Sequence, residues 1–196
     1  LSAGVSVRTF LWCPELAHST EAGQRAEQLA ERAEAAYRVS AKTLERIGER
    51  GQPDGLLSVV RLPQLTPDLL EFGPSALVLV ADAVEIPGNL GTLIRTLDAV
   101  RADALVLTNR RTRLTHPKVL RSSQGMSMTV PALEFAEVAD AIAWLRGAGA
   151  TVYLAETGGP VSYRDADYSG RTALVVGSER YGLAPAWQAE GFSKIS

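Results

Sequence analysis

Hydrophobic and polar positions follow two different patterns along this chain. In its first part, residues 6–13 form a short run rich in β-forming side chains. Residues 20–39 then place apolar side chains three and four positions apart, which forms one stripe made of Ala22, Ala26, Leu29, Ala30, Ala33 and Tyr37. These patterns predict a strand and then an amphipathic helix. A second helix over residues 41–49 and a strand over residues 55–62 complete a small predicted α/β unit.

Beyond residue 75 the apolar positions form short continuous runs separated by helical stretches. The runs cover residues 76–81, 104–107, 151–155 and 173–176. The helical patterns cover residues 92–100, 116–124 and 138–148. Strands that are buried on both faces and alternate with helices are typical of a parallel sheet. The sequence therefore predicts an α/β fold with an open, mostly parallel sheet and helices on both faces.

Proline and glycine mark the boundary between the two patterns. Residues 63–74 contain Pro63, Pro67 and the pair Gly73-Pro74, so they are the predicted linker. We expect a small α/β domain over residues 1–62 and a larger one over residues 75–196. The chain starts without methionine and stops at the beginning of a predicted strand after Phe192, so we expect both ends to be incomplete.

Composition excludes several classes of protein. The chain has 196 residues, of which 46% are hydrophobic and 21% charged, with a formal net charge of −2, so it is neither disordered nor uniformly basic. No window approaches the roughly 18 apolar residues of a membrane span, and we expect a soluble, cytoplasmic protein. With one cysteine and two histidines, the chain offers no disulfide, and we expect no metal site.

Two loops that follow predicted strands carry the candidate chemistry, because ligands of open parallel sheets bind at the carboxyl ends of the strands. The first spans residues 82–91 and contains Asn89, and Arg95 lies about one turn into the following helix. The second spans residues 177–183 and contains Gly177 and Glu179. Each loop taken alone is also compatible with ordinary turn and capping chemistry. The spacing of a dinucleotide-binding loop and that of a P-loop are both absent.

Together, the two loops resemble the motifs of a known family. Asn89-x-Gly91-x-x-x-Arg95-Thr96, followed by Gly177-x-Glu179-x-x-Gly182-Leu183, is similar to the first and second motifs of the SpoU/TrmH family of SPOUT methyltransferases. The family's middle signature is matched by Arg121-Ser122-Ser123-Gln124-Gly125 and Val130-Pro131. Its ribosomal-protein-like RNA-binding domain is matched by Gln52-Pro53-Asp54-Gly55 and Val59-Val60.

The resemblance implies an enzyme that transfers a methyl group from S-adenosylmethionine to a ribose 2′-hydroxyl of structured RNA. It implies 23S rRNA as the favoured substrate, a homodimer, and a C-terminal trefoil knot preceded by a small RNA-binding domain. The family's third motif, an Ile-Pro-Met stretch with a Ser-Leu-Asn-Val-Ser helix, is absent because the chain ends at Ser196. We therefore expect the knot segment to be missing from this chain.

The resemblance also implies roles for individual residues. Arg95 would hold the phosphate beside the target ribose and help to activate the hydroxyl. Asn89 and Glu179 would orient Arg95 or the substrate. Gly177 would let the cofactor approach the main chain, and Ala155 and Thr157 are further candidates for the cofactor site.

Charge indicates an RNA-binding surface independently of the resemblance. Between residues 101 and 121 there are six positive side chains and one negative, a local net charge of +5 on a chain of net charge −2. This pattern is typical of a defined phosphate-binding surface, and a solvated loop is its alternative. The candidate RNA-binding residues are Arg110, Arg111, Arg113, Lys118 and Arg121.

Three other functions stay open at the level of the sequence. The chain could modify tRNA instead of rRNA. It could be a non-catalytic RNA-binding protein that keeps the fold, or a different nucleotide-binding α/β enzyme.

Overall fold

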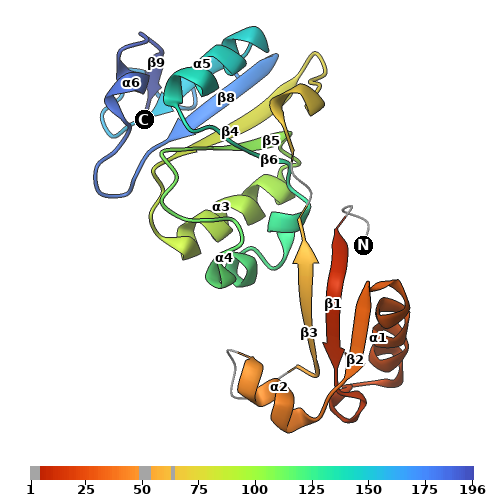
Figure 1. Ribbon diagram of the computed structural model, residues 1–196. Coiled ribbons are helices and arrows are strands. Elements are labelled where there is room, and N and C mark those ends of the chain that lie inside the picture. Colours follow the sequence, from red (N-terminus) through yellow and green to blue (C-terminus); the bar gives the residue numbers. More distant parts are fainter. Residues whose placement is uncertain (1–4, 49–53, 63–64) are drawn as a thin grey trace. The chain divides into compact units, whose positions relative to one another are not determined.

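The structure is a computed structural model that describes residues 5–48, 54–62 and 65–196 (Figure 1). It divides into two compact units, Leu1–Gln64 and Leu65–Ser196. The last residues of the helix predicted over 41–49, and the Gln52-Pro53 part of the matched motif, lie outside the described residues.

The first unit contains a three-stranded sheet in the order β2-β1-β3. Its strands are β1 (Ser6–Trp12), β2 (Ala35–Arg38) and β3 (Leu56–Arg61), with β2 parallel and β3 antiparallel to β1. Its helices are α1 (Thr20–Arg32) and α2 (Ala41–Ile47). A short 3-10 helix, Pro14–Leu16, follows β1. The small core of this unit is formed by Val7, Phe10, Trp12 and Ala26.

The prediction of a helix over residues 20–39 is wrong beyond Arg32. Helix α1 begins after Ser19, whose side chain accepts a hydrogen bond from the backbone N–H of Ala22, and ends at Arg32. Tyr37 lies in β2 and is 56% exposed, so it does not continue the apolar stripe. The free edge of β1 provides backbone hydrogen bonds that a longer helix could not use, and this tertiary context overrides the helical pattern.

The second unit contains a six-stranded sheet in the order β6-β5-β4-β8-β7-β9, and every pair within it is parallel. Its strands are β4 (Ala76–Asp82), β5 (Ala104–Thr108), β6 (Ala132–Glu134), β7 (Thr151–Ala155), β8 (Arg171–Val176) and β9 (Ser193–Ile195). The central strands are buried on both faces, as their continuous apolar runs predict.

Helices cover both faces of this sheet, which confirms the predicted layers (Figure 1). Helices α3 (Pro87–Ala99) and α4 (Pro117–Ser122) pack on one face, around a cluster that includes Leu90, Ile94 and Val119. Helix α5 (Val138–Gly147) and the short α6 (Pro185–Gln188) pack on the other, around Leu145 and Trp187.

Two details of the second unit differ from the sequence-based expectation. Helix α3 begins at Pro87 instead of residue 92, because proline suits the first helical position. Gly88 and Gly91 therefore lie inside the helix and not in the loop before it. Asn89 therefore lies in the first turn of α3. Strand β6 was not predicted, since three residues are too few to show a pattern, and a 3-10 helix, Met126–Met128, precedes it.

The described part of the predicted linker belongs to the second unit. From residue 65 onward it includes a 3-10 helix, Pro67–Leu69, and Leu65, Leu70 and Phe72 pack against the core beneath α5. The guanidinium of Arg171 also donates hydrogen bonds to the backbone oxygens of Phe72 and Gly73, so this segment is held against the sheet.

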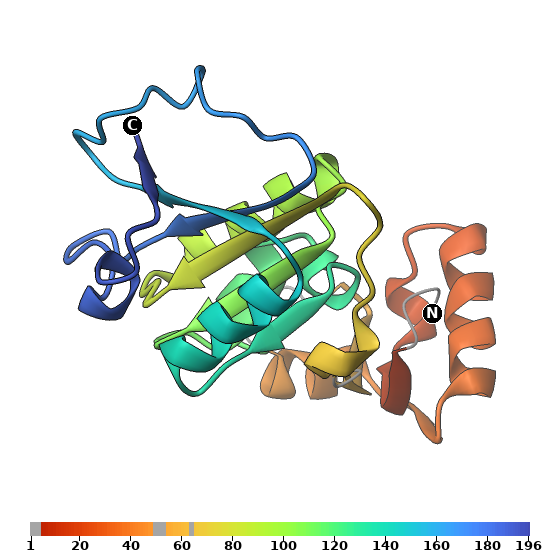
Figure 2. The ribbon, with the colours of Figure 1, turned by 90° about the horizontal axis from the view of Figure 1, so that it is seen from above.

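Strand β9 lies between β7 and the segment that follows residue 160. It pairs with β7, and Ile195 forms a parallel bridge with Val161. The backbone N–H of Ser196 donates to Val161, and that of Tyr163 donates to Ser196. Figure 2 shows the loop between β7 and β8 passing around the C-terminal end of the chain.

Within the described ranges, no helix is both long and apolar enough to cross a membrane. The same ranges also contain no group of three or more His, Cys, Asp or Glu side chains placed to hold a metal ion.

Candidate active site

The candidate site lies where the parallel strands of the second unit end. Because β4, β5, β7 and β8 run in the same direction, the loops that leave their carboxyl ends meet at one edge of the sheet. The loop after β4 leads into α3, and the loop after β8 leads toward α6. This edge gathers the predicted residues Asn89, Gly177 and Glu179.

Asn89 and Glu179 are in direct contact. The side-chain amide nitrogen of Asn89 donates a hydrogen bond of 2.7 Å to Oε1 of Glu179, although the two residues are 90 positions apart. The loops that follow β4 and β8 therefore converge at this edge of the sheet.

Glu179 is held as a carboxylate. Partial burial raises its pKa, but hydrogen bonds from its own backbone N–H, from Asn89 and from the backbone of Glu85 lower it by more, so the pKa lies below the ordinary value. Since the ionised form accepts these bonds, Glu179 is suited to orienting Asn89 and poorly suited to removing a proton at neutral pH.

The loop after β8 folds back tightly on itself. The backbones of Ser178 and Gly182 exchange hydrogen bonds of 3.0 and 2.9 Å, and the Ser178 hydroxyl accepts from the N–H groups of Arg180 and Tyr181. A Cβ atom at Gly177 would lie 2.3 Å from the carbonyl carbon of Gly182. Glycine is thus required at position 177 by this fold-back, a reason that the sequence did not reveal.

A cavity of about 550 Å³ opens between the ends of β7 and β8. Its lining includes the three residues predicted for the cofactor, Ala155, Thr157 and Gly177, together with Glu179. Its volume falls within the range of small-molecule sites, roughly 300–1,000 Å³. One cavity therefore joins the predicted cofactor residues to the carboxylate that contacts Asn89.

A charged network borders this cavity on the β9 side. Lys194 forms an ion pair of 3.0 Å with Oε2 of Glu156, and Gln188 bridges the two through its side-chain amide. The hydrogen bond from Lys194 is the largest influence on Glu156 and lowers its pKa despite partial burial. The network ties β9 and α6 to the end of β7.

The sequence missed the role of Asp82. This residue ends β4 and is fully buried, with Oδ1 accepting from the Thr108 hydroxyl at 2.9 Å and from the Asn109 side chain at 2.8 Å. Its Oδ2 accepts from the backbone N–H of Ala184 at 2.8 Å. Asp82 therefore ties the loop after β5 and the far end of the loop after β8 to one strand. The only signal in the sequence was an acidic residue closing an apolar run.

Arg95 lies on the exposed surface of α3, and among the described residues its guanidinium has no hydrogen bond or ion pair. Gly88 and Arg95 are seven residues apart, about two helical turns, so they share one face of α3. A Cβ at Gly88 would lie 3.8 Å from Cε of Lys118, which places that lysine beside the same face. An unpaired guanidinium and an ammonium group thus border the first turns of α3.

Helices α3 and α4 approach each other very closely at Gly91. A Cβ there would lie 1.9 Å from Oγ of Ser122 and 2.9 Å from the backbone nitrogen of Ser123. Gly91 is needed for this contact. At the other end of α4, Nδ1 of His116 accepts a hydrogen bond from the backbone N–H of Lys118, so this histidine caps the helix.

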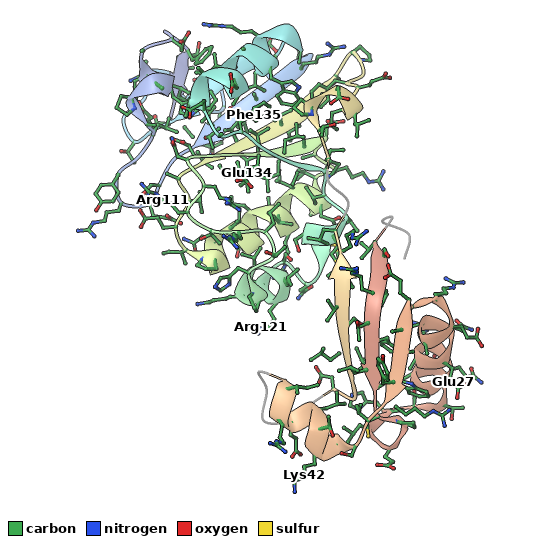
Figure 3. All side chains as sticks on the ribbon, in the orientation of Figure 1. Glu27, Lys42, Arg111, Arg121, Glu134 and Phe135 are labelled. Carbon is green, nitrogen blue, oxygen red and sulfur yellow. The ribbon has the colours of Figure 1, made fainter. Side chains whose placement is uncertain are left out.

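The predicted basic residues differ in their ion pairing and in their position on the unit. Arg110 forms an ion pair of 2.7 Å with Glu134, which lies on β6 and was not counted in the basic stretch. Figure 3 shows the side chains of Arg111, in the loop after β5, and Arg121, on α4, well apart. These two residues of the basic stretch therefore do not share one cluster.

Comparison with known proteins identifies similar chains. The model of the SpoU rRNA Methylase family matches residues 76–191. A 23S rRNA (uridine(2479)-2′-O)-methyltransferase of Streptomyces viridochromogenes is 28% identical over 94% of this chain and 66% of its own length. The 23S rRNA (guanosine(2553)-2′-O)-methyltransferase RlmP of Bacillus subtilis is 31% identical over 76% of this chain and 58% of its own length. The chain thus spans less than two thirds of the length of these relatives.

Two solved structures share the fold of this chain. The structure of an AdoMet-bound rRNA methyltransferase from Sinorhizobium meliloti superimposes with a TM-score of 0.87 and 26% identity, covering 99% of this chain and 72% of that one. The AdoMet complex of the SpoU methyltransferase AviRb from Streptomyces viridochromogenes also gives a TM-score of 0.87, with 24% identity, and covers 100% of this chain and 75% of that one.

Proposed function

Because the chain belongs to the SpoU rRNA methylase family, we propose that it transfers a methyl group from S-adenosylmethionine to a ribose 2′-hydroxyl of structured RNA, with 23S rRNA favoured over tRNA. The relatives named for activity on 23S rRNA support this choice of substrate. The observation that carries the proposal is the contact between Asn89 and Glu179 at the edge of the 550 Å³ cavity.

The cavity fits the proposed cofactor. Its lining combines small residues, among them Ala155, Thr157 and Gly177, with three charged residues, Glu156, Glu179 and Arg180, which suits a compact ligand that also carries charged groups. When bound there, S-adenosylmethionine would supply a methyl group activated by a sulfonium. The Lys194–Glu156 pair would hold the wall formed by β7 and β9 in place.

The protein's own residues would position the hydroxyl. Arg95 is exposed and unpaired among the described residues, and its planar guanidinium can bind a phosphate oxygen with two hydrogen bonds. Lys118, beside the same face of α3, would add a second positive charge for the RNA backbone. Asn89, which is oriented by Glu179, would hold the substrate or Arg95 in position. Positioning of this kind can supply several kcal/mol of a reaction barrier.

The proposal extends to the parts of the chain around this site. Arg111, Arg113 and Arg121 would contact RNA phosphates, with Arg110 contributing less because of its ion pair with Glu134. The first unit would be the RNA-recognition domain. We further propose assembly as a homodimer and a cytoplasmic location, in line with what the resemblance to the family implies. Strand β9 lies between β7 and the segment after residue 160, and we propose that the trefoil knot implied by the resemblance would start from this arrangement.

Mass spectrometry of rRNA tests the reaction directly. Unmodified 23S rRNA and unmodified tRNA are each incubated with the protein and with S-adenosylmethionine, and the products are searched for one new 2′-O-methyl group. We expect the modification on rRNA and not on tRNA. The absence of any methylated nucleotide would contradict the proposed activity.

The variant Arg95→Lys tests the assigned phosphate contact, since it keeps the charge but loses the planar fork. We expect methyl transfer to fall roughly a hundredfold, as for other positioned hydrogen-bond donors at reacting centres, while binding of S-adenosylmethionine is unchanged. Arg146→Lys is the matched control, because Arg146 lies on α5 and pairs with Glu190. Normal methylation by Arg95→Lys would remove Arg95 from the mechanism.

A further inference from the structure

A second, smaller cavity of about 260 Å³ lies on the other side of the loop that follows β8. Its lining comes from three loops at the carboxyl edge of the sheet, and includes Asp82, Glu85, Asn109, Arg111 and Tyr181. This volume lies below the roughly 300–1,000 Å³ of typical small-molecule sites, so the cavity suits a single flat ring system better than a whole cofactor.

The two cavities share a wall. Ser178, Gly182 and Leu183 line both of them. Glu85, on the rim of the smaller cavity, reaches Glu179 through a backbone hydrogen bond. A group in the smaller cavity would therefore lie next to the Asn89–Glu179 pair, on the side opposite the proposed cofactor.

Tyr181 presents its ring at the rim of this smaller cavity. It is 71% exposed, the largest exposed fraction among the described large hydrophobic residues. Its backbone is held by the hydrogen bond to Ser178, and the guanidinium of Arg180 lies 5.2 Å from the ring centroid. The ring is thus presented to solvent on a turn whose backbone is already ordered, which lowers the entropic cost of binding to it.

Polar groups without partners complete the lining. Among the described residues Arg111, which lies in the loop after β5 (Figure 3), has no ion pair or hydrogen bond. The amide nitrogen of Asn109 donates to Asp82, which leaves its amide oxygen facing no donor within the described ranges. A ligand here would meet an aromatic face, a cation and a hydrogen-bond acceptor.

We propose that this smaller cavity receives one nucleobase of the substrate RNA, stacked on Tyr181, with Arg111 and Asn109 contacting its edge or the adjoining phosphate. The proposal rests on the proposed function in that RNA is the substrate. Every base has a flat face that an aromatic ring can stack on, and stacking platforms beside positive charges are typical of single-stranded RNA sites. A base bound here would leave its own or its neighbour's ribose near the Asn89–Glu179 pair.

Binding measurements with and without bases test this proposal. The probes are a fluorescent oligouridylate and a ribose-phosphate oligomer of the same length that lacks bases, each titrated by anisotropy against the whole chain. The variants are Tyr181→Ala, Tyr181→Phe and Arg111→Ala. The matched control is Tyr163→Ala, because Tyr163 is also exposed and also lies under a neighbouring arginine, Arg164.

We expect Tyr181→Ala to weaken binding of the oligouridylate by roughly five- to a hundredfold and to leave binding of the abasic oligomer unchanged. Tyr181→Phe should bind as the wild type does, and Tyr163→Ala should keep the wild-type preference for bases. Arg111→Ala should weaken both probes and reduce the salt dependence by about 0.7 in slope, as for one phosphate contact on a single strand.

Two results would overturn the proposal: an unchanged affinity of Tyr181→Ala for the oligouridylate, or an equal loss on both probes. Calorimetry with S-adenosylmethionine on the same preparations separates this outcome from failure of the proposed function. If the cofactor does not bind while the Tyr181-dependent preference for bases persists, the enzymatic proposal fails and the nucleobase site stands.

Discussion

Replacing Asp82 by asparagine removes one charge and one acceptor from the fully buried position where three segments of the second unit meet. The carboxylate accepts three hydrogen bonds, from Thr108, Asn109 and the backbone N–H of Ala184. In Asp82→Asn the shape is nearly unchanged, but one oxygen becomes an NH₂ group. The backbone N–H of Ala184 can neither rotate nor accept, so it requires the remaining oxygen.

The cost follows from this arrangement. If the remaining oxygen of the new side chain faces Ala184, the Thr108 hydroxyl and the Asn109 amide must reorient to accept from the new NH₂ group. If the NH₂ group faces Ala184 instead, it meets the backbone N–H of that residue, and two donors face each other. In either orientation the hydrogen bonds no longer involve a charged acceptor. Because a hydrogen bond to a charged group contributes about 1.5–3 kcal/mol, we expect the free energy of unfolding to fall by about that amount. Since Ala184 follows the cavity wall at Leu183, we also expect the Kd for S-adenosylmethionine to rise by roughly tenfold, which corresponds to about 1.4 kcal/mol.

Urea denaturation measures the first quantity, and isothermal calorimetry on the folded protein measures the second. Asp103→Asn is the matched control, because Asp103 accepts a bond of 2.7 Å from the backbone N–H of Leu77 at the opposite end of β4. This control should lose stability without a change in cofactor affinity. A wild-type Kd for Asp82→Asn, or the same rise in Kd for both variants, would refute the assignment of Asp82 to the site.

Two further predictions concern packing and charge. Gly91→Ala should lower the free energy of unfolding by about 1–3 kcal/mol, because the added Cβ overpacks against Ser122 and this outweighs a helix-propensity gain of about 1 kcal/mol. Gly147→Ala is the control, since an added Cβ there meets nothing within 4 Å, and it should show no loss of stability in urea denaturation. The pKa of Glu179 is lowered in the folded protein, so the stabilisation by this carboxylate should be fully present above its ordinary value of 4.5 and disappear as the pH falls through the lower folded value. A carboxyl NMR titration should show this low pKa and its upward shift in Asn89→Ala, and an unshifted pKa would contradict the assigned hydrogen bond.

The layered architecture of the second unit follows from local sequence patterns. Strands buried on both faces need continuous apolar runs, and such runs mark β4, β5, β7 and β8 in the sequence. Because parallel strands end at a common edge, the convergence of the loops bearing Asn89 and Glu179 could also be inferred before any coordinates were known.

What the sequence did not reveal depends on partners far away along the chain. Strand β2 forms because β1 offers a free edge, which no local pattern encodes. The donors of Asp82 come from 26, 27 and 102 positions away. The need for glycine at position 177 arises from the backbone of Gly182, and an apolar run followed by Gly-Ser-Glu does not indicate that fold-back.

The 90 positions between Asn89 and Glu179 in the sequence also affect the order in which this protein folds during translation. A nascent chain that has emerged only as far as α4 already carries Asn89, Arg95 and Lys118, but it lacks the carboxylate that orients the asparagine. Closing a loop of 90 residues is among the slower steps of folding, because its entropy is lost before any contact forms. Translation therefore delivers the cationic surface first and the hydrogen-bonded pair afterwards, so the groups proposed to bind RNA are present before the pair proposed to orient the reaction is complete.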